Sequence, residues 1–163
     1  MEIVISDTNI FIDLWNIGLL ERFCELPLSI HTTDFIIGEL KTQGVKDAIA
    51  QLHQEGKITI KTFKSNEYAE IISLQDKNLS FQDCTVLYYA LNGDYKLLTG
   101  DRNLRVIAER HGLQVSGIIY VMDELLHHDI LSKEEYITKL KALLESNHRL
   151  PTKEIMKRIE DSL

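Results

Sequence analysis

Four acidic residues in the first 101 positions lie where strands are expected to end or helices to begin. They are Asp7, Glu39, Asp83 and Asp101. If the strands near them are parallel, the carboxylates meet at one edge of one sheet, outside the carboxyl ends of the strands. Carboxylates that converge without neutralising basic residues need metal ions, and metal ions held in this way indicate phosphodiester chemistry.

Each of the four acids also fits an ordinary structural role. Asp7 and Asp101 stand at positions favoured for helix N-caps. Asp83 follows Ser80 by three residues, which is the spacing of a capping box worth about 1 kcal/mol. Glu39 fits a solvated helix face. Because 25 of the 163 residues are acidic, no single position identifies a site by itself.

The elements that would position these acids alternate between strand and helix. Short apolar or alternating runs predict five strands, at residues 2–5, 28–31, 58–63, 96–99 and 114–116. Apolar residues at helical spacing predict helices in between, and Gly44 and Gly93 are expected to end two of them. This alternation favours the α/β class, as a three-layer α/β/α sandwich around a mostly parallel five-stranded sheet.

Beyond Gly117 the sequence predicts only helices. These cover residues 118–128, residues 132–147 with a Ser132–Glu135 capping box, and a short segment after Pro151. No linker rich in Gly, Ser or Pro interrupts the chain. We therefore expect one domain over residues 1–163, in which residues 118–163 form a helical C-terminal region.

The composition indicates a globular protein of the cytoplasm. A chain of 163 residues with 44% hydrophobic residues can bury a core without disulfides, and Cys24 and Cys84 lack metal-ligand spacing. Neither a secretory signal nor an apolar run of the roughly 20 residues of a membrane span is evident. The net charge of -7 argues against a passive nucleic-acid binder. It argues less against a metal nuclease, because bound cations would neutralise the four acids.

Three ordered segments resemble motifs of the PIN domain, a family of metal-dependent ribonucleases that includes toxins of VapC type. These segments are Asp7-Thr8-Asn9, Leu79-Ser80-Phe81-Gln82-Asp83-Cys84 and Leu98-Thr99-Gly100-Asp101, with Glu39 in a fitting position. The resemblance covers most of residues 1–125. Residues 115–126 and the helical tail are similar to a bacterial and archaeal branch whose members are often described only as nucleic acid-binding proteins.

The resemblance implies a function and a site. The function is hydrolysis of RNA or single-stranded nucleic acid by an endoribonuclease that uses one or two Mg²⁺ or Mn²⁺ ions. The implied metal ligands and catalytic residues are Asp7, Glu39, Asp83 and Asp101, and the residues that line the site are Thr8, Asn9 and Thr99. Hard cations of this kind take oxygen ligands, which carboxylates supply.

Arg102 and Arg105 directly follow the last of these acids. An arginine in the first turn of a helix can bind a phosphate together with the helix N-terminus, and a pair of solvated cations is the alternative. Proteins similar to VapC toxins pair with a small antitoxin, and homodimers are common among them. The candidate dimer residues, which fit a plain core equally well, are Phe11, Trp15, Leu19 and Leu20.

Two other classes of protein with acidic residues near the first strand fit less well. A phosphatase of the haloacid dehalogenase type needs a second aspartate two positions later, where this chain has Asn9. A receiver domain needs an aspartate at the end of a mid-chain strand, where this chain has Lys64. The alternative from a different class is a catalytically silent module of the same fold that binds nucleic acid or protein.

Overall fold

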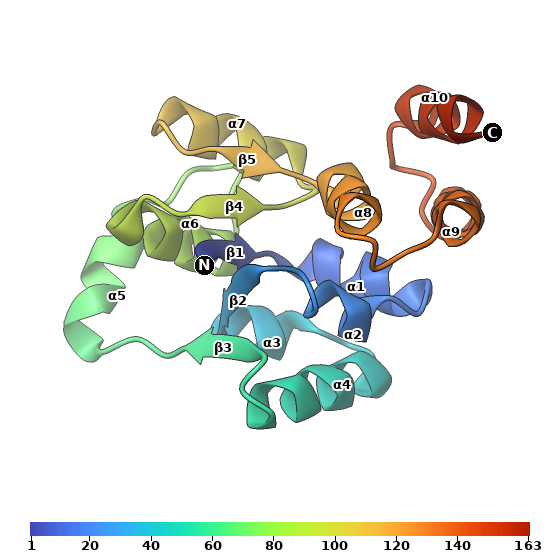
Figure 1. Cartoon of the computed structure of the whole chain (residues 1–163). Helices are drawn as coiled ribbons and strands as arrows, with labels where there is room; N and C mark the ends of the chain where they lie inside the picture. Colours follow the sequence, from blue (N-terminus) through green and yellow to red (C-terminus); the bar gives the residue numbers. More distant parts are fainter.

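The computed structural model describes all 163 residues and contains one sheet of five parallel strands (Figure 1). The strands are β1 (Glu2–Ser6), β2 (Leu28–Thr33), β3 (Ile58–Lys61), β4 (Lys96–Leu98) and β5 (Val115–Ser116). Their order across the sheet is β3-β2-β1-β4-β5, and every neighbouring pair is parallel. The predicted α/β class with a mostly parallel five-stranded sheet is confirmed.

Helices cover both faces of this sheet. The first seven are α1 (Thr8–Asn16), α2 (Leu20–Phe23), α3 (Asp34–Glu39), α4 (Gln43–Gln54), α5 (Ser65–Ile72), α6 (Phe81–Gly93) and α7 (Arg102–Arg110). The chain moves one way across the sheet from β1 to β3 and the other way from β3 to β5, so right-handed crossovers place the connecting helices on opposite faces. Figure 1 shows α5, α6 and α7 on one side and α1, α2 and α4 on the other.

The centre of the sheet sets the position of the edge where Asp7, Glu39, Asp83 and Asp101 are expected, which we call the acidic edge. Val4 and Ile5 of β1 are fully buried, as expected for the middle strand of a sheet covered on both faces. The register pairs Ser6 with Leu98, so Asp7 and Thr99 leave β1 and β4 at the same level. Helix α3 continues directly from β2 and contacts both α1 and α6, which keeps its last residue, Glu39, at the same end of the sheet.

The C-terminal region is helical and packs against the first two helices. It consists of α8 (Ile118–His127), α9 (Lys133–Ser146) and α10 (Thr152–Ser162) (Figure 1). Helix α9 contacts α1 and α8, and α10 contacts α9. The Lys139 ammonium donates to the Ile17 carbonyl at 2.7 Å, and the Asn147 amide donates to Asp13 at 3.0 Å. None of the helices has the length and apolar character needed to cross a membrane.

Two glycines expected just beyond the ends of helices are themselves helical residues. Gly44 is in the first turn of α4, and α6 continues through Gly93. A Cβ atom at Gly44 would lie 2.6 Å from Cζ2 of Trp15, and one at Gly93 would lie 2.0 Å from Cζ of Tyr95. Close approach of an aromatic ring, rather than a helix stop, therefore explains both glycines.

The left-handed residue that ends α6 is Asp94, with φ of 53°. Aspartate tolerates this conformation better than most residues, because its short side chain can bond locally. The prediction of Gly93 at this position was therefore one residue early.

Most of the candidate dimer residues belong to the core. Phe11, Leu19 and Leu20 are buried within the protein, whereas the Trp15 side chain is 39% exposed. A homodimer remains a prediction, and of the four residues only Trp15 is available on the surface to take part in one.

Candidate functional site

Asp7 is the most buried of the four acids and joins the ends of two strands. It is 3% exposed and caps α1, where its Oδ1 accepts a hydrogen bond from the Thr8 backbone N–H at 2.8 Å. Its Oδ2 accepts a bond from the Thr99 hydroxyl at 2.7 Å. The residue that follows β1 is therefore bonded directly to the residue that follows β4.

Asp101 belongs to the same network through the backbone. Its N–H donates to the Thr99 hydroxyl at 3.0 Å, and its Oδ1 accepts from the Leu104 N–H, so that it caps α7. A second bond ties the two loops together, because the Gly100 N–H donates to the Asn9 side-chain oxygen at 2.8 Å. Thr99 and Asn9, both predicted to line the site, thus hold the loop that carries Asp101 against the loop that carries Asp7.

Glu39 and Asp83 reach this edge from two further helices. The Thr8 hydroxyl donates to Oε1 of Glu39 at 2.6 Å, which connects the end of α3 to the start of α1. Asp83 forms a capping box with Ser80: each side chain accepts a bond from the other residue's N–H at 3.0 Å. The capping roles foreseen for Asp7, Asp83 and Asp101 are therefore real, and they fix these carboxylates at helix N-termini.

The four carboxylates influence one another electrostatically. Burial raises the pKa of Asp7 from 3.8 to about 7, the bonds from Thr99 and Thr8 oppose this rise, and the charges of Asp83 and Glu39 add to it. Burial also raises the pKa of Asp83, and the charges of Asp101 and Glu39 contribute. No Lys or Arg forms an ion pair with any of the four acids. The edge is therefore a region of uncompensated negative charge.

The chemistry of these donors fits a hard divalent cation, which takes carboxylate oxygens and water as ligands. The second oxygens of Asp83 and Asp101 accept no bond from the protein. The side-chain positions do not close around one point, because no three His, Cys, Asp or Glu side chains lie close enough together to hold one ion. Glu39 is exposed and Asp83 and Asp101 are half-buried, so their rotamers can change.

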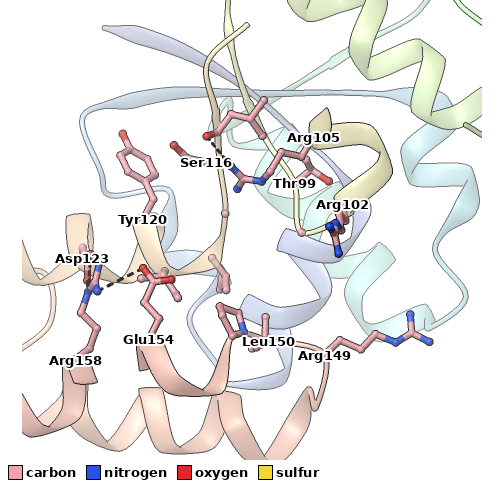
Figure 2. A pocket seen from close by; sticks show the side chains of 16 residues that line it. Thr99, Arg102, Arg105, Ser116, Tyr120, Asp123, Arg149, Leu150, Glu154 and Arg158 are labelled. Carbon is pink, nitrogen blue, oxygen red and sulfur yellow. Dashed lines mark hydrogen bonds and ion pairs between the residues drawn. The ribbon is translucent and has the colours of Figure 1, made fainter. Parts of the chain in front are cut away.

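Arg102 and Arg105 lie on the first turns of α7, beside the acidic edge. Arg102 is exposed and makes no ion pair, and Arg105 donates to the Val115 carbonyl at 3.2 Å. Both line a cleft of ≈ 600 Å³ that begins at Thr99 and Gly100 (Figure 2). Both arginines therefore lie along this cleft, and their role in binding phosphate remains a prediction.

The far wall of this cleft was not foreseen from the sequence. It is formed by α8, by the segment before α10 and by α10 itself, including Asp123, Arg149, Glu154 and Arg158. The Arg158 guanidinium donates to Oδ2 of Asp123 from Nε at 3.2 Å and from Nη2 at 3.0 Å. Its Nη1 lies 3.5 Å from Oε1 of Glu154.

The hydroxyl of Thr99 is expected to be essential for stability because it serves two buried partners. Replacing Thr99 by Val removes the donor to Asp7 and the acceptor of the Asp101 N–H, which should lower the free energy of unfolding by about 1–3 kcal/mol. Urea unfolding at pH 8 measures the change. Thr62→Val, at an exposed position, is the control and should have little effect; an equal loss in both variants would argue against the bond to Asp7.

Comparison with known proteins gives one family. A family model described as a PIN domain matches residues 3–162 of the chain. Among solved structures, a domain of a functionally unknown protein from Methanocaldococcus jannaschii DSM 2661 is similar, with a TM-score of 0.48 and 20% identity over 72% of this chain and 91% of that chain. No curated protein matches the sequence. The family match includes both the acidic edge and the C-terminal helices.

Proposed function

Because the chain belongs to the PIN domain family, we propose that it is a metal-dependent endoribonuclease that hydrolyses phosphodiester bonds of RNA or another single-stranded nucleic acid. One observation carries the proposal. Four carboxylates from separate loops and helices act on one another at one edge of the sheet, and no basic residue pairs with them. Unpaired carboxylates placed this close together lower the stability of the fold, and a bound cation would neutralise them; such a cost is typical of a functional site.

In this proposal Asp7, Glu39, Asp83 and Asp101 hold Mg²⁺ or Mn²⁺. The bound ion would supply a Lewis acid for the phosphate oxygens and a lowered pKa for water. The protein contributes positioning. Thr99 orients the carboxylate of Asp7, and Thr8 orients that of Glu39. With a pKa of about 7, the Asp7 carboxyl holds a proton in much of the metal-free protein at neutral pH and releases it when a cation binds.

The partners and the location belong to the same proposal. We propose a cytoplasmic protein whose 163 residues form one domain. A hollow beside Glu39 is lined by Trp15 and Ile12, which are 39% and 37% exposed, and by Val45. An antitoxin that covers the acidic edge would bury the exposed Ile12 and Trp15 side chains, and so would a second copy of the chain.

Cleavage of a mixed-sequence single-stranded RNA tests the proposal. Cleavage should require Mg²⁺ or Mn²⁺, should stop with EDTA, and should fall about 100-fold or more in Asp83→Asn, since loss of a ligand should cost at least as much as loss of a group that orients one. Asn retains an acceptor for the Ser80 N–H, so the helix cap should survive. Asp94→Asn, at the opposite end of α6, is the matched control and should cleave like the wild type.

Two outcomes would count against the enzyme. If the wild type binds RNA without cleaving it at any metal concentration, the catalytically silent module is the better description. If Asp94→Asn loses as much activity as Asp83→Asn, the acidic edge has no special role in the reaction.

A further inference from the structure

The cleft beside the acidic edge concentrates positive charge in a protein of net charge -7. Four arginines line it, namely Arg102, Arg105, Arg149 and Arg158, against two carboxylates, those of Asp123 and Glu154. Both carboxylates pair with the same arginine, Arg158. The other three arginines form no ion pair, so they are available to an anionic ligand.

These three arginines come from opposite walls of the cleft. Arg102 and Arg105 belong to α7, whereas Arg149 lies in the segment between α9 and α10. Figure 2 shows Arg102 on the wall formed by α7 and Arg149 across from it at the mouth, where its side chain extends outward. A ligand that meets both arginines must therefore be extended, or must continue beyond the mouth of the cleft.

The cleft adjoins the acidic edge, although none of the four acids lines it. Thr99 and Gly100 line it, and Thr99 is hydrogen-bonded to Asp7. A volume of ≈ 600 Å³ lies within the range of about 300–1,000 Å³ that holds small organic ligands, so the cleft has room for about one or two nucleotides. A strand cleaved at the acidic edge would thus pass directly into it.

We infer that this cleft binds the phosphodiester backbone of a single-stranded nucleic acid next to the cleavage point, and that the C-terminal region supplies one wall of it through Arg149. The inference rests on the proposed function and deepens it. Guanidinium groups bind phosphate oxygens through paired hydrogen bonds, which suits the three arginines that form no ion pair; Arg105 keeps further N–H groups beside the one that donates to the Val115 carbonyl. The ion pair between Arg158 and Asp123 holds α10 against α8 and so keeps the wall in place.

Binding of a fluorescein-labelled single-stranded RNA tests the inference. The measurement uses full-length Asp83→Asn protein with Mg²⁺, so that the probe stays intact. Adding Arg102→Gln and Arg149→Gln should weaken binding about tenfold or more and reduce the slope of log affinity against log salt by about 1.4, because each phosphate contact contributes about 0.7. Both arginines lie on the surface and make no ion pair, so folding should be unaffected.

The control removes two positive charges elsewhere. Lys133→Gln with Lys141→Gln changes two exposed residues of α9 outside the cleft and should leave the affinity and the salt slope nearly unchanged. Equal effects of the two double variants would overturn the inference, and so would adenosine monophosphate binding as tightly as the RNA. If the wild type cleaves RNA, and Arg102→Gln with Arg149→Gln leaves both binding in the Asp83→Asn background and cleavage in the wild-type background unchanged, the cleft inference fails while the proposed nuclease stands.

Discussion

The variant Asp7→Asn is expected to lose metal-dependent cleavage of RNA, by about 1,000-fold or more, while becoming more stable than the wild type at pH 8 by about 2 kcal/mol. The two effects have one cause. The wild-type carboxylate is buried and surrounded by other negative charges, so its ionised form is costly in the absence of a cation. An amide has the same shape without the charge, and it still accepts the bond from the Thr8 N–H.

The pH dependence follows from the direction of the shift in the pKa of Asp7. The unfolded chain releases this proton near pH 4, whereas the folded protein keeps it until about pH 7. Between these values the folded state binds more protons, so the contribution of Asp7 to stability is complete below pH 4 and is lost as the pH rises through 7.

Urea unfolding of both proteins at pH 5 and pH 8, without divalent ions, measures the difference. The stability advantage of Asp7→Asn should be largest at pH 8 and clearly smaller at pH 5, where the folded wild type keeps its carboxyl neutral although the unfolded chain has already released the proton. The same advantage at both pH values would show that burial of the charge is not its origin. Asp94→Asn, which changes an exposed acid, should show no such dependence.

Short-range patterns were sufficient to predict the acidic edge. Asp7 and Asp101 follow apolar strands directly, and in a parallel sheet the carboxyl ends of the strands share one edge. The sequence left open whether these acids are helix caps or site residues. In the structure the two roles are compatible, because capping fixes one oxygen of Asp83 and of Asp101 and leaves the other without a protein partner.

The cleft could not be predicted, because it depends on how distant segments pack. Arg149 lines the same cleft as the α7 arginines only because α9 folds back onto α1, where Tyr136 and Leu140 are buried and Asn147 is bonded to Asp13. Amphipathic spacing predicts that α9 is a helix but not which part of the protein it contacts. The prediction that Gly44 ends a helix was wrong for a related reason, because the close approach of Trp15 to Gly44 is a tertiary contact.

Mn²⁺ is expected to stabilise the folded protein more strongly at pH 8 than at pH 5. A ligand that binds only the folded state adds about 2.7 kcal/mol at 100 times its dissociation constant. At pH 5 the ion must displace the proton that Asp7 holds, since its pKa is raised to about 7, and the gain should shrink accordingly. The pH dependence thus reports on the acidic edge without any measurement of cleavage.

Thermal unfolding with and without Mn²⁺ at the two pH values measures this gain. Asp83→Asn and Asp7→Asn should each lose most of it, whereas Asp94→Asn should keep it. The structure makes the test demanding, because its carboxylates lie at one edge without closing around a point, so the ion must draw Glu39, Asp83 and Asp101 together. The cost of that rearrangement lowers the affinity, and relief of the repulsion on Asp7 raises it. An unfolding temperature that is the same with and without Mn²⁺ at pH 8 would mean that the cost of the rearrangement exceeds the relief of the repulsion. These four acids would then not hold a cation by themselves.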